Sequence, residues 1–241
     1  MITIVTVTYN AGKTIERTLK SVAMQTYKDY EHLIIDGAST DCTVDIASEY
    51  DTVIVSEPDK GLYDAMNKGI RLAKGEWIVF LNAGDKLHSV DTLQHIAEKT
   101  TLPASGIIYG DTDIVDDEGV KIRNRRLVPP LQLTWRSFRE GMLVCHQSFY
   151  INKEIAQMYD LGYRFSADFD WCIRCMKEGE KRGLRNIYLR EPLTDYLSEG
   201  MTTANHKASL KERFWIMSKH YGFMDSMLCH AWFVVRAIIK K

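Results

Sequence analysis

Trp77–Leu87 reads WIVFLNAGDKL, an apolar run that stops abruptly in polar residues. The first five residues are typical of a strand buried in the middle of a core. Asn82, Gly84 and Asp85 follow immediately, with only Ala83 between them. An amide and a carboxylate directly after such a strand indicate a functional loop, because loops at the ends of strands carry binding and catalytic residues.

Strand and helix patterns alternate before this run. We expect strands at residues 2–8, 32–35 and 53–55, and helices at 13–25, from the capping residues 39–41 up to 50, and at 62–74. This order predicts an α/β fold with a Rossmann-like, mostly parallel central sheet and helices on both faces. Ligands bind such sheets beyond the carboxyl ends of the strands. The polar loops at 8–10, 36–41, 57–61 and 82–85 are therefore expected to form one site at one edge.

The pattern changes after residue 100. Strands are expected at 106–109, 120–126, 142–151 and 186–189, and a helix at 169–177. The expected organisation is one domain over residues 1–205, with a nucleotide-binding half at 1–100 and an acceptor half at 101–205. Residues 206–241 are expected to form amphipathic, basic C-terminal helices.

Composition argues against several classes of protein. The 241 residues carry a formal net charge of −1, which argues against a nucleic-acid-binding protein. The five cysteines are irregularly spaced, which favours a reducing compartment over a disulfide framework. The N-terminus has no basic segment followed by an apolar one, so we expect no signal peptide and a cytoplasmic location.

Four segments resemble the family 2 glycosyltransferases in sequence and in order. They are residues 5–10 (VTVTYN), 35–41 (IDGASTD), 75–85 (GEWIVFLNAGD) and 166–171 (SADFDW). The match covers about residues 1–200 and implies the GT-A fold. It also implies transfer of a sugar from a nucleotide donor to an acceptor hydroxyl, usually with inversion and with Mg²⁺ or Mn²⁺. Uridine is the family's commonest base, so the expected donor is a UDP-sugar, and the expected acceptor is a saccharide or a lipid-linked one.

The resemblance and the helix N-terminus at residue 62 together place candidate donor-binding residues in the loops at the sheet edge and at the start of the helix at 62–74. They are Thr8, Tyr9, Asn10, Asp36, Ser39, Asp41, Lys60, Asp64, Asn67, Asn82, Ala83 and Gly84. Asp36 would accept a hydrogen bond from the nucleobase; an Asx-turn before Gly37 is the alternative. Helix capping explains Ser39 and Asp41 equally well. Lys60 lies beside the start of the helix at 62–74, where a helix N-terminus and a cation suit a diphosphate.

Asp85 is the candidate metal ligand. The family usually places two aspartates in a D-x-D motif here, but this chain has Asn82 and Asp85 around Ala83 and Gly84. A divalent ion prefers carboxylate oxygen, and Asn82 offers only a neutral carbonyl. The alternative is that Asp85 caps a following helix.

Asp168 is the candidate catalytic base. The family places an acidic pair before a helix, and here Ala167 replaces the first acid while Asp168 aligns with the second. Asp170 is the rival, but the two do not share a helix face, so only one should enter the site. The alternative for both is stabilisation of a helix N-terminus. His146 and Gln147 are weaker candidates for contact with acceptor or phosphate, because a lone histidine in a strand is more often a core residue.

The last residues form a strongly amphipathic helix if 224–241 is wound as one. Residues 206–241 hold seven Lys or Arg against two acidic residues. Two interpretations stay open: the helix docks on its own domain, or it lies in a membrane interface at the inner face of the plasma membrane. A lipid-linked acceptor would make the second useful.

Two other functions compete with an inverting glycosyltransferase of surface polysaccharide or glycolipid synthesis. A sugar nucleotidyltransferase would share the sheet and the metal, but residues 8–14 lack the glycine-rich, arginine-containing loop that holds a triphosphate. A non-catalytic nucleotide-sugar-binding module is supported by the missing first aspartate of the metal motif.

Overall fold

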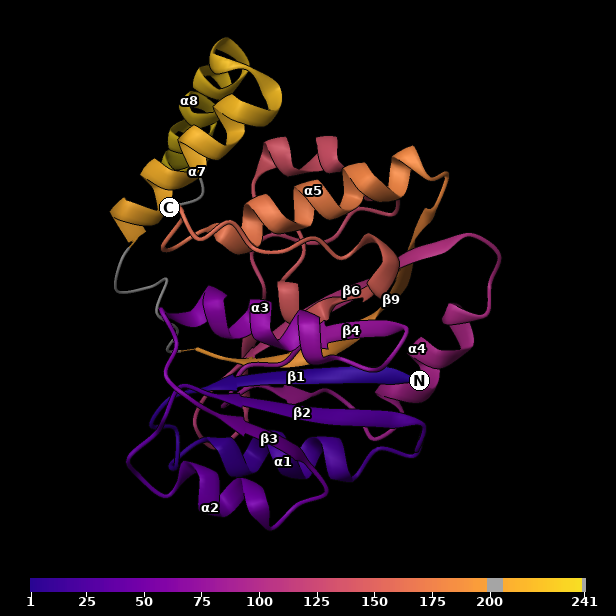
Figure 1. Ribbon diagram of the computed structural model, residues 1–241. Helices are drawn as coiled ribbons and strands as arrows, with labels where there is room; N and C mark the ends of the chain where they lie inside the picture. Colours follow the sequence, from indigo (N-terminus) through magenta and orange to yellow (C-terminus); the bar gives the residue numbers. More distant parts are fainter. Residues whose placement is uncertain (199–205, 240–241) are drawn as a thin grey trace.

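The computed structural model describes residues 1–198 and 206–239. A nine-stranded sheet crosses the molecule, with helices on both faces (Figure 1). Its first half consists of β1 (Ile2–Thr8), α1 (Ile15–Ala23), β2 (Tyr30–Asp36), α2 (Thr43–Ser48), β3 (Val53–Ser56), α3 (Leu62–Leu72) and β4 (Trp77–Phe80). The alternation of strand and helix predicted for this half is confirmed.

The second half is less regular. It contains β5 (Lys86–Leu87), α4 (Thr92–Thr100), β6 (Ser105–Val115), β7 (Lys121–Asn124), η1 (Trp135–Glu140), η2 (His146–Ser148), β8 (Phe149–Asn152), η3 (Lys153–Ile155), α5 (Ala167–Lys181) and β9 (Arg185–Leu197). Two helices follow, α7 (His206–Tyr221) and α8 (Phe223–Ile239). The resemblance also predicts a glycine-rich loop at 198–202, of which only Ser198 lies within the described residues.

The strand order is β3-β2-β1-β4-β8-β6-β9-β5, with β7 paired to β6. Strands β3, β2, β1 and β4 are parallel, β8 runs antiparallel between β4 and β6, and β6 is parallel to β9. The predicted mostly parallel α/β sheet is confirmed. Thr8 lies opposite Asp36 in the register, so the loops after β1 and β2 start at the same edge.

Alternate residues of the central strands enter different cores, which fixes the two-sided architecture. Val5 and Val7 of β1 pack in the core that contains α3 and α5 residues. Ile2 and Ile4 of the same strand pack in the second core, with residues of α1 and α4. Both faces of β1 are therefore buried, including its three threonines.

Three predicted strands have the wrong bounds. The strand expected at 106–109 is β6, which runs on to Val115. The strand expected at 142–151 is only β8, because Ser148 N donates to the Cys145 carbonyl and closes a 3₁₀ turn over His146 and Gln147. The strand expected at 186–189 runs on to Leu197, past Pro192. Its ladder with β6 shifts register between Tyr109 and Asp111, and such irregularities tolerate proline.

The C-terminal helices form a hairpin against α5, drawn in yellow at the top of Figure 1. Helix α7 contacts α5, and α8 contacts α7 and η1. Within the described residues, each helix is too short or too polar to cross a bilayer.

Candidate active site

A pocket of about 450 Å³ lies beyond the carboxyl ends of β1 and β4. Its walls come from the start of α3, the loop after β4, the turn η2, the first turn of α5, the end of β9 and α7. Segments separated by more than two hundred residues thus meet at the one edge that the strand-end rule indicates.

Eight of the sequence-predicted residues line this pocket. They are Thr8, Tyr9, Asn82, Ala83, Asp85, His146, Gln147 and Asp168. Another nine predicted residues do not line it: Asn10, Asp36, Ser39, Asp41, Lys60, Asp64, Asn67, Gly84 and Asp170. The two carboxylates on which the chemistry was predicted to depend, Asp85 and Asp168, are therefore brought together.

Asp85 is buried on the pocket wall and held from two sides. Its Oδ1 accepts a hydrogen bond from the Leu197 backbone N–H at 2.9 Å, and its Oδ2 accepts one from Gln147 Nε2 at 2.8 Å. Burial raises the pKa of Asp85 to about 6 against the opposing effect of these two donors. Asp85 caps no helix, since α4 begins at Thr92 with Asp91 as its N-cap.

The loop that presents Asp85 is tied down by Thr18 of α1. Thr18 Oγ1 donates to the Asp85 carbonyl at 2.6 Å and accepts from the Gly84 N–H at 2.9 Å. Gly84 has a φ of 100°, a conformation that favours glycine. Gly84 therefore shapes the loop, although it does not line the pocket.

A divalent cation fits the oxygen atoms in this loop. The buried Oδ1 of Asn82 has no hydrogen-bond partner among the described residues. Asn82 and Asp85 both line the pocket, and their neutral and charged oxygens are ligands that Mg²⁺ and Mn²⁺ accept. A buried oxygen without a partner is costly unless a ligand satisfies it.

A second group of metal-ligand type lies on β6 and β9 and just after β5. Ligand atoms of His88, Asp113 and Asp195 all lie within 4.8 Å of one another. Lys121 pairs with Asp113 at 2.8 Å, and Lys86 pairs with Asp195 at 3.0 Å. These lysines neutralise the carboxylates, so the group is an ion-pair network rather than a cation site.

Asp168 lies in the first turn of α5 and faces the pocket. Its Oδ1 accepts from the Phe169 N–H at 2.9 Å and from the Tyr63 hydroxyl at 3.4 Å. His146 Nδ1 lies 3.6 Å from Oδ2, a contact rather than a good hydrogen bond. Burial alone would raise the pKa of Asp168, but His146 and Arg213 hold it below its ordinary value.

Asp170 points away from the pocket, as the helical spacing predicts. It is fully buried and pairs with Arg174 Nε and with His220 Nε2, the latter at 2.8 Å. Asp170 therefore joins α5 to α7, whereas Asp168 is the acid of the pair that enters the pocket.

Asp36 has the turn role that was its alternative interpretation. Its carboxylate accepts from the Ser39 N–H at 2.9 Å, from the Ser39 hydroxyl and from the Ser56 hydroxyl at 2.6 Å. The neighbouring loops are bound to each other: Asn10 Oδ1 accepts from the Thr40 N–H, and Asp41 Oδ2 accepts from the Gly12 N–H. These polar residues hold the loops after β1 and β2 in place.

The residues expected to hold a diphosphate beside α3 do not line the pocket. Asn67 is buried and exchanges two hydrogen bonds with the backbone of Tyr159, at 3.0 and 2.6 Å. Asp64 Oδ2 accepts from the Lys60 N–H at 3.0 Å. The Lys60 side chain is absent from the pocket wall, which receives Leu62 and Tyr63 from this helix.

Sequence reasoning missed the two cations that do line the pocket, Arg125 and Arg213. Arg125 follows β7, and Arg213 comes from α7. The buried Nε of Arg213 has no partner among the described residues, and its guanidinium lies 5.8 Å from the Phe169 ring centroid. Glu212 beside it accepts from the backbone N–H groups of Arg164, Phe165 and Ser166 at 2.8–2.9 Å. Nothing in the tail pattern indicated that Arg213 faces inward.

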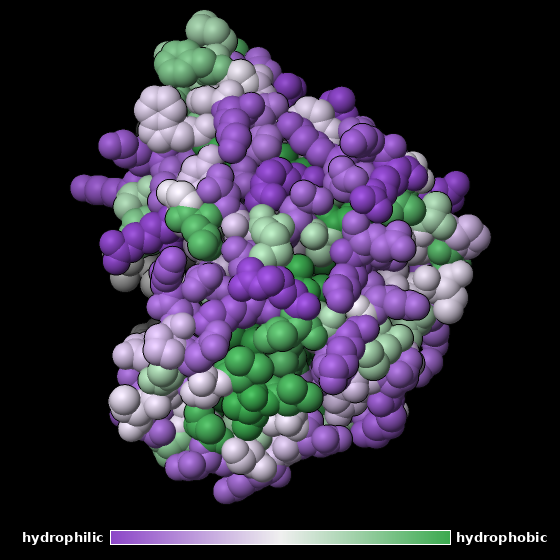
Figure 2. All heavy atoms as spheres, viewed as in Figure 1, coloured by the Kyte–Doolittle hydropathy of each residue, from purple (hydrophilic) through white to green (hydrophobic). Residues whose placement is uncertain are grey.

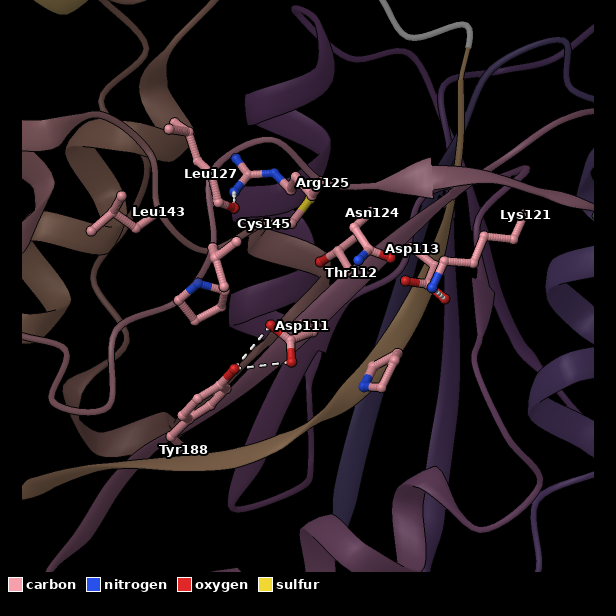
Figure 3. Close-up of a pocket in the computed structure, with 13 residues that line it drawn as sticks. Asp111, Thr112, Asp113, Lys121, Asn124, Arg125, Leu127, Leu143, Cys145 and Tyr188 are labelled. Carbon is pink, nitrogen blue, oxygen red and sulfur yellow. Dashed lines mark hydrogen bonds and ion pairs between the residues drawn. The ribbon is translucent and has the colours of Figure 1, made fainter. Parts of the chain in front are cut away.

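A second cavity of about 270 Å³ adjoins this pocket and shares Arg125 and Cys145 with it (Figure 3). Figure 3 shows the Tyr188 hydroxyl between the two oxygens of Asp111, and both contacts measure 2.9 Å. Arg125 lines both cavities, and its Nη1 donates to the Leu127 carbonyl at 3.2 Å.

Comparison with known proteins agrees with this geometry. Residues 3–161 match the model of the family described as Glycosyl transferase family 2. A PGL/p-HBAD biosynthesis glycosyltransferase of Mycobacterium bovis is 34% identical over 185 residues, covering 73% of this chain and 69% of the relative. The amylovoran biosynthesis glycosyltransferase AmsB of Erwinia amylovora is 28% identical over 229 residues, covering 86% of this chain and 74% of the relative.

Solved structures share the fold. The S. aureus TarS 1–349 structure in complex with UDP-GlcNAc superposes with a TM-score of 0.73 at 16% identity, covering 90% of this chain. The chain spans 64% of that structure's length, just under two thirds. Glucosyl-3-phosphoglycerate synthase from Mycobacterium tuberculosis, in complex with Mn²⁺, UDP and its product, gives 0.64 at 14% identity and covers 90% of this chain and 79% of that one. The fold is thus of the GT-A type, and the chain belongs to glycosyl transferase family 2 and is a glycosyltransferase.

Proposed function

We propose that the protein transfers a sugar from a nucleotide-diphosphate donor to an acceptor hydroxyl with inversion of the anomeric centre. The observation that carries this proposal is the meeting of Asp85, Asp168 and two arginines on the wall of one pocket. A metal ligand, a base and cations are the groups that such a displacement needs. UDP is the proposed nucleotide, since UDP or UDP-GlcNAc is bound in two of the similar structures.

Asp85 and Asn82 are the residues that would hold Mg²⁺ or Mn²⁺. The bound ion would neutralise the charge that develops on the leaving diphosphate. Support comes from the unpartnered Asn82 oxygen and from the Mn²⁺ in the glucosyl-3-phosphoglycerate synthase structure. Gln147 keeps the Asp85 carboxylate in place through its hydrogen bond to Oδ2.

Arg125 and Arg213 are the proposed contacts of the diphosphate. A guanidinium matches phosphate oxygens with two parallel N–H donors, and the free Nε of Arg213 supplies one of them. They take the place of Lys60, Asp64 and Asn67, whose side chains do not reach the pocket. Thr8 and Tyr9 frame the nucleobase, while Asn10, Asp36, Ser39 and Asp41 act through the loops that they hold.

Asp168 is the proposed base. Its lowered pKa keeps the carboxylate ionised at neutral pH, ready to accept the proton of the acceptor hydroxyl. His146 lies beside it and is placed to orient the carboxylate or the acceptor. Deprotonation makes the acceptor oxygen the nucleophile, which displaces the diphosphate from the opposite side of the sugar.

The proposed acceptor is a saccharide or a lipid-linked glycan. The relatives' names refer to PGL/p-HBAD and amylovoran biosynthesis, which favours a glycolipid or a surface polysaccharide. We propose a cytoplasmic protein that works at the inner face of the plasma membrane.

Asp168→Asn tests the base. Without a carboxylate, transfer should fall by at least about 100-fold, while UDP affinity measured by calorimetry with Mn²⁺ stays within about twofold. Asp170→Asn is the control for folding, since any loss that it causes should lower transfer and UDP affinity together. Undiminished transfer by Asp168→Asn would remove Asp168 from the mechanism, and wild-type protein without metal-dependent UDP binding would favour the non-catalytic module.

A further inference from the structure

The outward face of α8 is apolar, which is the reverse of the usual arrangement of a surface helix. Its exposed side chains form one stripe: Met224, Met227, Leu228, Ala231, Trp232 and Val235. Met224 is 69% exposed and Leu228 is 68% exposed. The spacing of three, four and seven residues places all of them on one side of the helix.

The polar stripe of α8 faces the protein instead. Ser226 is buried, and its hydroxyl donates to the Gly222 carbonyl at 2.8 Å. His230 lies against the Phe214 ring of α7 at 5.2 Å. Phe233 packs against the main core, and Asp225 pairs with Arg139 at 2.8 Å. The helix is thus docked on its own domain by one side, and the docking leaves the apolar stripe uncovered.

Aromatic side chains extend this surface beyond α8. Trp215 of α7 is exposed, as is Phe223 at the turn between the two helices. Figure 2 shows the tip of the hairpin as pale green, apolar atoms at the top of the view. Tryptophan and phenylalanine at the edge of an apolar patch suit the boundary between lipid headgroups and acyl chains.

Charge favours an anionic partner for this surface. Residues 206–241 hold seven basic residues, of which Arg213 lines the pocket and Lys219 lies 3.8 Å from Asp160. Their two acidic residues are both engaged within the protein. Glu212 binds backbone N–H groups before α5, and Asp225 pairs with Arg139. Lys207 and Lys211 are exposed on α7 beside Trp215. Basic residues next to an apolar stripe attract anionic lipid headgroups.

We infer that the hairpin of α7 and α8 docks on an anionic bilayer through the stripe Met224–Val235, with Trp215 and Phe223 at its border. The inference deepens the proposed membrane location by naming the surface that meets the lipid. Helix α7 turns Arg213 into the donor pocket and its exposed lysines outward, so docking holds the pocket next to the bilayer. A lipid-linked acceptor would therefore arrive at the same side of the molecule.

Vesicle sedimentation of the full chain tests this surface. Wild-type protein should bind vesicles of phosphatidylcholine with about 30% phosphatidylglycerol, and bind pure phosphatidylcholine at least about tenfold more weakly. Met224→Glu with Leu228→Glu should lower the affinity at least about tenfold, because charge is placed in the apolar stripe. Leu72→Glu with Leu102→Glu is the matched control and should stay within about twofold, since these leucines are exposed just before β4 and β6, at the sheet edge opposite the pocket.

Three results would overturn the inference. Equal binding by the stripe variant and the wild type would show that another surface meets the lipid. No binding by wild-type protein would remove the membrane as partner. A wild-type dimer that the stripe variant converts to a monomer, with no vesicle binding, would assign the stripe to a second copy of the chain. The assay contains no donor or acceptor, so Asp168→Asn should bind vesicles normally, and failure of the proposed transfer would leave the outcome unchanged.

Discussion

At the scale of single residues, Asp85 combines a functional position with a cost to the fold. Burial raises its folded pKa to about 6, above the value of about 3.9 for an unfolded aspartate. As the pH rises, Asp85 therefore keeps its proton to a higher pH in the folded state than in the unfolded state. Stability contributed by the neutral form is present below about pH 4 and is lost as the pH rises through about 6.

Asp85→Asn should remove this titration. The free energy of unfolding of the variant, relative to wild type, should rise by on the order of 2 kcal/mol between pH 4 and pH 7.5. Urea unfolding of both proteins at the two pH values measures the difference, and other titrating groups cancel in the comparison. Mn²⁺ with UDP should stabilise only the wild type at pH 7.5. A stability difference that does not change with pH would show that Asp85 titrates normally.

Residues at strand ends were predictable, whereas their partners were not. Thr8 ends β1, and Asn82 and Asp85 lie in the loop after β4, so topology alone brings them to one edge. The hydrogen bonds that occupy Asp36 and Asn67 come from residues far along the chain, such as Ser56 and Tyr159. A sequence pattern shows that a polar residue is near the site, but it does not show which backbone group satisfies that residue.

At the scale of elements, α7 joins the C-terminal hairpin to the helix that carries Asp168. Glu212 accepts three backbone N–H groups just before α5, and Ser209 Oγ lies 2.8 Å from Ser166 Oγ. His220 adds a hydrogen bond to Asp170. The first turn of α5 is therefore positioned from outside its own sequence neighbourhood.

Glu212→Ala should destabilise the protein by about 2–4 kcal/mol, because the partly buried N–H groups of Phe165 and Ser166 and the exposed one of Arg164 lose their acceptor. Glu212→Gln keeps one acceptor oxygen and should cost roughly half as much. Denaturant unfolding measures both, and the exposed neighbour Lys211→Ala should stay within about 0.5 kcal/mol of wild type. If Glu212→Ala matched Lys211→Ala, the junction between α7 and α5 would not depend on Glu212.

The polar and apolar residues of α7 are not arranged in a way that shows which side faces the domain. The side that faces the domain carries Glu212, Arg213 and His220 together with the buried Ile216 and Met217. The outward side carries Trp215, so the two sides are not separated by hydropathy. An amphipathic pattern predicts orientation only when apolar residues face inward. In α8 the pattern is clear, but the apolar side faces outward.

At the scale of the whole molecule, the two C-terminal helices divide between the pocket and the surface. Arg213 of α7 lines the proposed donor pocket, whereas no described side chain of α8 lies on its wall. The sheet and α7 together form the proposed donor site, and α8 adds an external face. The domain boundary predicted at 205/206 stays a prediction, and two truncations can examine it.

A chain ending at Gly222 lacks α8 and should keep its donor site. Its UDP affinity with Mn²⁺ should stay within about threefold of wild type, with some loss of stability because Cys229 and Phe233 no longer pack on the core. A chain ending at residue 205 also loses Glu212 and Arg213, so UDP should bind at least about tenfold more weakly. Calorimetry on both chains, with circular dichroism to verify folding, makes the comparison. Arg213→Gln in the full chain tests the guanidinium while keeping the helix. It should weaken the binding of UDP but leave the binding of uridine unchanged, because uridine has no diphosphate. If the shorter chain folded and bound UDP as tightly as the longer one, the donor site would be complete without α7.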